Sequence, residues 1–176
     1  MLKGKKVLLR PLKKSDCAFF VKWMNDPEIT QYLTLYLPLT ELEEEKWFEN
    51  LATGRKGIDV VFAIEDIKSK KLIGNCGLHK IDPKNHDAIL GIAIGDKKYH
   101  GRGYGTEAAT LLVDYGFNQL NLHRIGSSVY DFNLRSLNLH KLLGFRQEGR
   151  LRKKHFKNGK FHDEIFLGLL KEEWKK

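Results

Sequence analysis

The sequence predicts an α+β fold built around one mixed sheet. Short apolar runs alternate with segments of helical periodicity, in the order strand, two helices, three strands, helix, strand, helix and two strands. One apolar strand, residues 88–94, leads through a glycine-rich turn directly into a helix. The last two strands are joined by Asn158-Gly159, which is a strong signal for a β-hairpin.

Length and composition are those of a globular protein. The 176 residues fit one domain, 1–176, that is long enough to bury a core. Lysine and arginine exceed aspartate and glutamate by 31 − 22 = 9, which suits nucleic acid, ribosomes or anionic small molecules as partners. A solvated basic surface is the simpler explanation of this charge, so a nucleic-acid partner is not required.

The sequence contains no recognisable membrane span, signal peptide or metal site. No apolar run approaches the roughly 18 residues that span a bilayer, and the N-terminus lacks the apolar region of a signal peptide. Cys17 and Cys76 form no C-x-x-C pair and no cluster with zinc spacing. We therefore expect two buried free thiols, a cytoplasmic protein and no bound metal.

The first part of the chain predicts a strand and a helix. Residues 7–10 form a short apolar strand that Pro11 ends. A helix follows from Ser15, a suitable N-cap, to about Asn25. It stops there because residues close before Pro27 avoid the α region.

A loop and a second helix come next. Residues 29–38 form a loop that is unusually rich in apolar side chains. Thr40 and Glu43 have the spacing of a capping box, so the second helix begins there. We expect it to end at Thr53-Gly54.

Three strands precede the glycine-rich turn. Residues 60–64 are apolar on both faces, which is typical of a central strand, and residues 72–78 and 88–94 follow as its neighbours. Polar turns at residues 66–71 and 82–87 connect the three strands.

The segment 100–105 is a turn with glycine at every second position, which suits neither a strand nor a helix. The helix after it runs from Thr106 to about Leu120, and four of its residues share the face that packs on the sheet: Ala108, Leu111, Leu112 and Tyr115. The N–H groups at the start of this helix suit an anion such as phosphate. Taken alone, the turn fits a tight structural connection equally well, and it matches neither a P-loop nor the dinucleotide fingerprint.

The last third predicts a strand, a short helix and a hairpin. The strand covers residues 123–130, and the helix runs from Asn133 to a glycine stop at Gly144. Three leucines of this helix are expected to face the core: Leu134, Leu137 and Leu142. The final strands cover residues 145–150 and 161–169, with the basic segment 150–157 between them. That segment could face an acidic partner such as a ribosome, and a solvated strand pair explains it more simply.

Two stretches carry a resemblance to a known family. Residues 92–108, which contain the glycine turn, and residues 133–145, which begin Asn-Leu-Arg-Ser, resemble the GNAT superfamily of acyl-CoA-dependent N-acetyltransferases. The similarity covers nearly the whole chain. Residues 23–28 and 158–164 are similar to the ribosomal-protein N-terminal (serine/alanine) acetyltransferase and spermidine acetyltransferase branch. The resemblance implies a GNAT-like sheet that is mixed and mostly antiparallel, is splayed at the cofactor site and carries helices on both faces.

The resemblance also implies the reaction and the cofactor site. Acetyl-CoA would be the co-substrate, and the acceptor would be a primary amine of a protein N-terminus (ribosomal-protein type) or of a small amine or polyamine. The pantetheine arm would pair with backbone in the splayed gap, and the pyrophosphate would lie on the glycine turn. The residues implied in cofactor binding are Ile92, Ala93, Ile94, His100, Gly101, Arg102, Gly103, Tyr104, Gly105, Thr106, Asn133 and Ser136.

The chain departs from the family pattern at three positions. His100 replaces the usual Gln or Arg, which a cradle of backbone donors tolerates. Ile89 replaces a Glu that acts as general base in many members, and this leaves the base open among His79, His86 and Asp87. The absence of this Glu mildly favours an N-terminal amine as the acceptor, because the pKa of such an amine, near ~8, leaves it partly neutral at pH 7.

The third departure is His140, which stands where the family usually has a Tyr that protonates the leaving thiolate. An imidazolium could supply this proton, so His140 is the candidate catalytic residue. The alternative is a histidine that only packs in the helix. Because of Ile89 and His140, a second function also remains open: a non-catalytic module that binds acyl-CoA or associates with RNA or ribosomes. The sequence leaves the oligomeric state open, a homodimer included.

The acceptor side of the site is the least defined by the sequence. Tyr32, Leu33 and Tyr36, together with Trp47, could wall an acceptor pocket or belong to the core. Asp163 and Glu164 could bind the charge of an amine or form salt bridges with nearby lysines.

Overall fold

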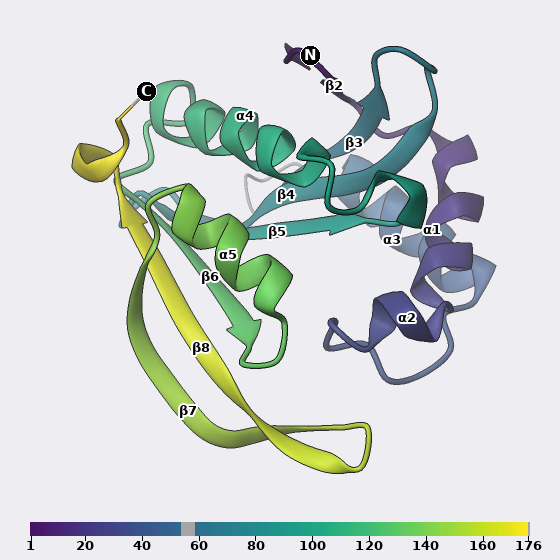
Figure 1. Cartoon of the computed structure of the whole chain (residues 1–176). Helices are drawn as coiled ribbons and strands as arrows, with labels where there is room; N and C mark the ends of the chain where they lie inside the picture. Colours follow the sequence, from purple (N-terminus) through teal and green to yellow (C-terminus); the bar gives the residue numbers. More distant parts are fainter. Residues whose placement is uncertain (54–58, 176) are drawn as a thin grey trace.

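The computed structural model describes residues 1–53 and 59–175 (Figure 1). Within these residues one eight-stranded sheet has the order β1-β2-β3-β4-β5-β6-β8-β7. The strands are β1 Leu2–Lys3, β2 Val7–Arg10, β3 Val60–Asp66, β4 Leu72–Asp82, β5 Asp87–Ile94, β6 Arg124–Tyr130, β7 Arg146–Lys157 and β8 Lys160–Leu170. The helices are α1 Cys17–Met24, α2 Pro27–Thr30, α3 Glu41–Thr53, α4 Tyr104–Asn118 and α5 Leu134–Leu142, with short 3-10 segments at Lys14–Asp16, Lys97–Tyr99 and Lys171–Glu173.

The strands pair antiparallel except for β5 and β6, so the predicted mixed, mostly antiparallel sheet is confirmed. The parallel pairing of β5 with β6 covers only Asp87 to Ile89 against Arg124 to Gly126. Beyond these pairs both strands continue, β5 to Ile94 and β6 to Tyr130. The sheet therefore forks between its two central strands.

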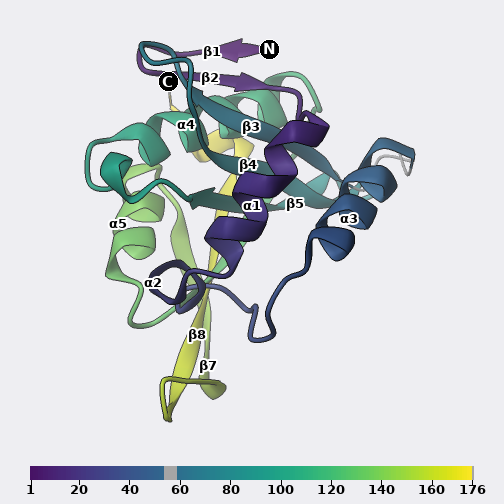
Figure 2. The ribbon, with the colours of Figure 1, turned by 90° about the vertical axis from the view of Figure 1, so that its right-hand side faces the viewer.

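Helices cover both faces of the sheet. Figures 1 and 2 show α4 and α5 on one face, and α1 and α3 on the other. The predicted inner face of α4 is confirmed: Ala108 and Leu112 are fully buried, and the Tyr115 ring meets the Phe62 ring edge-on at 5.6 Å. The helix begins at Tyr104, two residues earlier than expected.

The start of α1 differs from the prediction. Ser15 lies inside the 3-10 segment Lys14–Asp16, and α1 itself begins at Cys17, so Ser15 is not the N-cap. The Asp16 carboxylate instead accepts a hydrogen bond from the Lys13 N–H at 2.8 Å and pairs with Arg10, also at 2.8 Å. This buried ion pair connects the helix start to β2 and sets where the helix begins.

The apolar loop is partly helical. Asp26 caps α2 by accepting a hydrogen bond from the Glu28 N–H at 3.0 Å, so the expected loop 29–38 starts inside a helix. The capping box of α3 is confirmed, because the Thr40 N–H donates to Glu43 at 2.9 Å and the Glu43 N–H donates to Thr40 at 3.2 Å. The expected stop at Gly54 falls outside the described residues.

The C-terminal hairpin is longer than expected. The basic segment 150–157 is not a connection but part of β7, which pairs with β8 up to Lys157 and Lys160. Asn158 and Gly159 form the tight turn with φ values of 51° and 77°, as the Asn-Gly signal predicts. Figure 1 shows that this hairpin extends well beyond the rest of the sheet.

The inner face of α5 was predicted correctly at Leu137 only. Leu134 and Leu142 are 66% and 76% exposed, whereas Leu137 packs against the core and His140 is buried. Leucines occur all around this short helix, so their spacing does not define one face. The Asn133 cap and the packing of Leu137 and His140 set the orientation of the helix.

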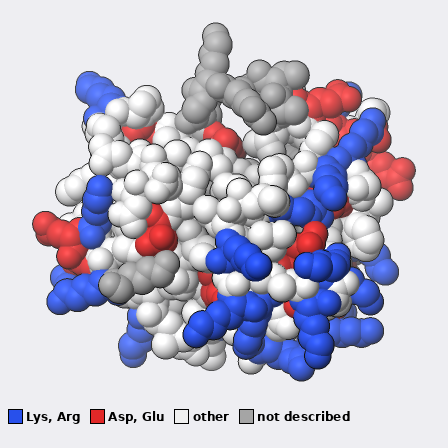
Figure 3. Space-filling view, turned by 90° about the horizontal axis from the view of Figure 1, so that it is seen from above, with Lys and Arg blue, Asp and Glu red and all other residues white. Residues whose placement is uncertain are grey.

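Three further features bear on the sequence predictions. Cys17 and Cys76 are buried free thiols, as expected, and burial raises the pKa of both. Among the described residues, none of the helices has the length and apolarity needed to cross a bilayer. Figure 3 shows lysine and arginine side chains gathered at the lower right of the face seen from above.

Candidate active site

A cavity of about 650 Å³ opens where β5 and β6 separate. Its walls come from Leu90–Ile94 of β5 and Ser127–Tyr130 of β6, from the glycine turn, from the inner side of α5, and from α2 with the loop after it. The fork in the sheet thus becomes a hollow that segments from the whole chain surround.

The edge of β5 offers unpaired backbone to this hollow. The Gly95 N–H donates to the Ile73 carbonyl of β4 at 2.9 Å. Because hydrogen-bonded residues alternate along an antiparallel ladder, the backbone of Ile92 and Ile94 points away from β4. Both residues line the cavity, so their backbone can bind an extended ligand that carries amides.

The glycine turn forms a cradle beside that edge. Gly101 and Gly103 have φ values of 69° and 84°, which L side chains rarely adopt. A Cβ built at Gly101 would meet no atom within 4 Å, so the space next to it is open. The first intrahelical bond of α4 runs from the Glu107 N–H to the Gly103 carbonyl at 3.0 Å, which leaves the N–H groups of residues 104–106 without helical partners. The turn fits a diphosphate bound by backbone donors.

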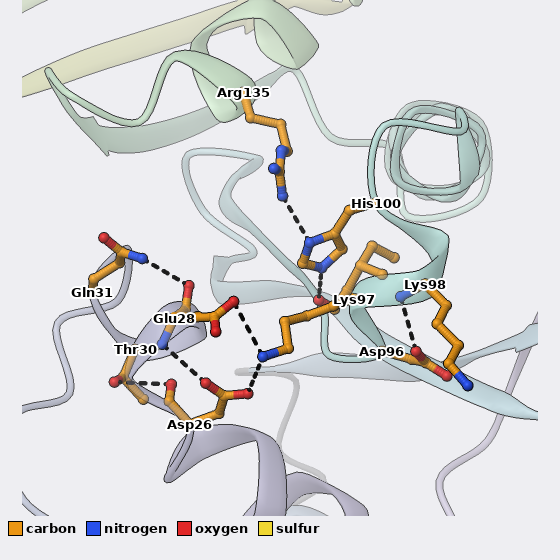
Figure 4. A network of polar contacts seen from close by, with 10 residues as sticks. Asp26, Glu28, Thr30, Gln31, Asp96, Lys97, Lys98, His100 and Arg135 are labelled. Carbon is orange, nitrogen blue, oxygen red and sulfur yellow. Dashed lines mark hydrogen bonds and ion pairs between the residues drawn. The ribbon is translucent and has the colours of Figure 1, made fainter.

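His100 connects this turn to two other walls of the cavity. Its Nε2 donates to the Ile94 carbonyl at 2.7 Å, and its Nδ1 accepts from Arg135 Nη1 at 2.8 Å (Figure 4). An imidazole that donates from Nε2 and accepts at Nδ1 is neutral.

Most of the predicted cofactor residues come together in the structure. Those that line the cavity are Ile92, Ala93, Ile94, His100, Gly101, Gly103, Gly105, Thr106, Asn133 and Ser136. Arg102 and Tyr104 are not among the lining residues. The Arg102 side chain donates to the Lys98 carbonyl at 3.3 Å, and the Tyr104 ring packs against the Tyr99 ring at 4.9 Å.

His140 lies in the wall formed by α5 and is only 2% exposed. Its Nδ1 donates to the Ser136 carbonyl at 2.8 Å, and its ring meets the Phe145 ring edge-on at 4.9 Å. Nε2 is buried and has no hydrogen-bond partner among the described residues. Burial lowers the pKa of His140, so the ring is neutral at pH 7 and Nε2 carries a free lone pair.

The residues proposed as an acceptor wall divide between cavity and core. Tyr32 and Leu33 line the cavity, whereas Trp47 packs edge-on against Phe20 at 6.5 Å in a small core cluster. Tyr36 is exposed and contributes to a second, smaller hollow instead.

Glu164 is the acidic residue most enclosed by the cavity. Its side chain is 14% exposed, and its Oε2 accepts a hydrogen bond from His155 Nε2 at 3.1 Å. Tyr130 lies opposite Glu164 in the ladder and donates to the Leu33 carbonyl at 3.3 Å. Burial, with a smaller effect of Glu164, raises the pKa of Tyr130. Asp163 binds the Lys153 N–H at 2.7 Å and Arg150, so it takes the salt-bridge role.

Glu28 is a second carboxylate in the lining, and it is tied to the start of the glycine turn. Lys97 Nζ lies 2.9 Å from Asp26 and 3.2 Å from Glu28, so it joins α2 to the segment before the turn (Figure 4). Hydrogen bonding to Asp26, then to Glu28, raises the pKa of Lys97. Because Lys97 compensates Glu28, Glu164 contributes more of the negative charge that an acceptor would meet.

None of the three candidate general bases lines the cavity. His79 Nδ1 pairs with Asp59 at 2.9 Å, and His86 Nδ1 donates to the Asn121 carbonyl at 3.1 Å. Asp87 lies in the paired part of β5, before the fork.

Sequence reasoning missed Tyr130, Glu28 and Arg135 as lining residues. They come from β6, α2 and α5; Glu28 and Arg135 lie inside the stretches 23–28 and 133–145 that carry the family resemblance, but no cavity role was assigned to them. Only the alternation of β6 could have suggested that one of its residues faces the gap.

Comparisons with known proteins identify relatives along the whole chain. Residues 6–146 match the acetyltransferase (GNAT) domain family. The chain is 31% identical over 171 residues to the uncharacterized N-acetyltransferase p20 of Bacillus licheniformis, covering 96% of this chain and 95% of that protein. It is 35% identical over 103 residues to the putative ribosomal N-acetyltransferase YdaF of Bacillus subtilis, covering 58% and 56%. Among solved structures, spermidine N-acetyltransferase from Vibrio cholerae in complex with CoA and spermine superimposes with a TM-score of 0.89 and 26% identity, covering 97% and 98%.

Proposed function

This chain belongs to the GNAT acetyltransferase family and is an acetyl-CoA-dependent N-acetyltransferase, and we propose that its acceptor is a positively charged primary amine of the polyamine type. Glu164 carries this proposal, since it places an enclosed carboxylate in the cavity of a chain whose net charge is +9. The solved relative that binds spermine supports the same class of acceptor.

The cofactor half of the proposal concerns the backbone of β5 and the glycine turn. Acetyl-CoA supplies an activated acetyl thioester when it is bound. The backbone of Ile92 and Ile94 would pair with the amides of its pantetheine arm, and the N–H groups of residues 101–106 would hold its pyrophosphate. Asn133 and Ser136 line the other side of the cavity and would contact the same ligand. Residues 1–176 would act as a single domain in this scheme.

The acceptor half concerns Glu164 and the residues around it. An ionised carboxylate that is mostly shielded from solvent attracts an ammonium group more strongly than an exposed one does. The Tyr32 ring and the Leu33 side chain, on the loop after α2, offer apolar surface for the methylene groups of a polyamine.

His140 is the proposed proton carrier. The neutral ring donates from Nδ1 to Ser136, so Nε2 must take up a proton before it can give one to the leaving thiolate. An acceptor amine enters as an ammonium group and must lose a proton to react. His140 can therefore take that proton and then deliver it to the thiolate, which keeps the proton-donor role without an imidazolium in the resting protein.

A protein N-terminal amine is the second candidate acceptor. Ile89 leaves the central strand without the carboxylate that would activate a strongly basic amine. An N-terminal amine, with a pKa near ~8, needs less activation than a polyamine amine near ~10.4. The similarity to a putative ribosomal N-acetyltransferase supports this candidate.

The two acceptors can be separated by measuring thiol release from acetyl-CoA with matched amines. Spermidine and spermine are compared with short peptides that begin with serine or alanine and with the same peptides blocked at the N-terminus. We expect kcat/KM at least ~10-fold higher for the polyamines, which is about 1.4 kcal/mol of transition-state binding. A preference for free peptide N-termini would replace the first candidate by the second. Binding of acetyl-CoA without release for any amine would contradict both.

A further inference from the structure

Arg135 is a cation at the cavity that the predicted cofactor site does not include. It is an exposed residue in the first turn of α5, and it lines the cavity. Its Nη1 donates to His100 Nδ1 at 2.8 Å, so its side chain spans the distance from α5 to the glycine turn (Figure 4).

This contact uses only a small part of the hydrogen-bonding capacity of the guanidinium. Arginine carries five N–H donors in a planar fork that fits carboxylate and phosphate groups. In the parts of the chain that the structure describes, no carboxylate lies within ion-pair distance of Arg135. A neutral imidazole is a weaker partner than a carboxylate or phosphate, because it offers the guanidinium a single lone pair and no negative charge, whereas these anions can accept two parallel N–H bonds.

His100 orients the guanidinium toward the turn. The same imidazole is held from its other side by the Ile94 carbonyl, at 2.7 Å. The ring is therefore held by β5 and presents one acceptor nitrogen to Arg135. The remaining N–H donors of Arg135 stay available beside backbone N–H groups that already suit a diphosphate.

We propose that Arg135 binds a phosphate group of the CoA cofactor and that His100 positions it to do so. The role rests on the proposed cofactor site and adds to it a side-chain ligand from the opposite wall. Arg135 and the backbone donors of residues 101–106 then hold the phosphate from two sides. The same helix, α5, carries His140 in the cavity wall.

The experiment compares Arg135→Ala, Arg135→Lys and the control Lys141→Ala in calorimetric titrations. Lys141 is an exposed cation on the same helix and does not line the cavity, so its removal reports the effect of net charge alone. The ligands are CoA, dephospho-CoA, which lacks the 3′-phosphate, and pantetheine, which lacks every phosphate. We expect Arg135→Ala to lower the affinity for CoA at least ~10-fold and Lys141→Ala to change it less than ~2-fold. The affinity of Arg135→Lys should fall between those of wild type and Arg135→Ala.

The ligand series identifies which phosphate Arg135 binds. A loss that persists with dephospho-CoA assigns Arg135 to the diphosphate, and a loss that disappears assigns it to the 3′-phosphate. The role is overturned if Arg135→Ala binds CoA as well as Lys141→Ala does, or if pantetheine loses as much affinity as CoA. Wild-type protein that binds no CoA would instead refute the cofactor site itself.

The positioning role of His100 is tested by a double-mutant cycle with His100→Phe. The ring shape is kept, but Nδ1 and Nε2 are lost, so Arg135 has nothing to orient it. Arg135→Ala should then cost less than ~3-fold in CoA affinity in the His100→Phe background. An undiminished ~10-fold loss in that background would show that Arg135 acts without His100.

Discussion

Ser127 Oγ donates a hydrogen bond to the Leu90 carbonyl at 3.4 Å, directly after the last paired residues of β5 and β6. A side chain thus makes the final link between the two strands before they separate. Past this link, residues of both strands line the cavity. The opening is therefore part of the sheet geometry, and it presents backbone of β5 beside the glycine turn.

Gly103→Val should weaken acetyl-CoA binding at least ~10-fold. Gly103 caps α4 with a φ of 84°, and a β-branched side chain strains that conformation and alters the turn. Calorimetric titration measures the change. Gly159→Val is the control, because Gly159 has a φ of 77° in the distant hairpin turn and nothing within 4 Å of its added Cβ. Equal affinity in the two variants would refute the cradle.

His140→Phe should lower the rate of thiol release at least ~10-fold and change acetyl-CoA affinity less than ~2-fold. The phenyl ring fills the space beside Phe145 but has no Nε2 to carry a proton. Stopped-flow detection of free thiol measures the rate. His123→Phe, at an exposed histidine outside the cavity lining, is the control. If His140→Phe releases thiol as fast as this control, His140 has no part in the reaction.

The stability of the protein should fall in acid partly through His140. Its pKa is lowered in the folded state by burial, so the unfolded chain binds a proton at higher pH than the folded chain does. Its contribution is therefore complete above the ordinary pKa near 6.5 and is lost as pH falls through the lower folded value. The slope due to one such proton is at most about 1.4 kcal/mol per pH unit.

Urea unfolding of wild type and His140→Gln between pH 8 and pH 5 measures this slope. Glutamine does not titrate in that range, so the variant should lose less stability than wild type below pH 6.5. Parallel curves for the two proteins would show that His140 is not linked to folding.

Glu164→Gln should raise KM for spermidine at least ~5-fold with a smaller change in kcat. Glutamine keeps the shape and can still accept from His155, but it removes the negative charge that attracts the ammonium group. Steady-state kinetics at several salt concentrations measures the effect. Glu172→Gln removes the same charge at an exposed position near the C-terminus. A matching change in KM in both variants would mean that only net charge matters.

Short-range sequence signals correctly predicted the features that neighbouring residues determine. The Asn158-Gly159 turn, the capping box of Thr40 with Glu43 and the inner face of α4 are all confirmed, because neighbouring residues determine each of them. The family motifs, in turn, contained most of the residues of β5, the glycine turn and α5 that line the cavity.

Features that depend on distant segments were not predictable in this way. The start of α1 follows from Arg10 on β2 pairing with Asp16, and the inner face of α5 follows from its place beside the cavity. The meeting of Arg135 with His100 joins residues 35 positions apart. Such contacts arise when the sheet brings its elements together, and no spacing within one element records them.

The structure of the complex with acetyl-CoA tests the central claim most directly. The account predicts the pantetheine arm in the gap between β5 and β6, with its amides hydrogen-bonded to the backbone of Ile92 or Ile94 and the pyrophosphate on the N–H groups of residues 101–106. Electron density that places the cofactor elsewhere and leaves this gap empty would contradict it.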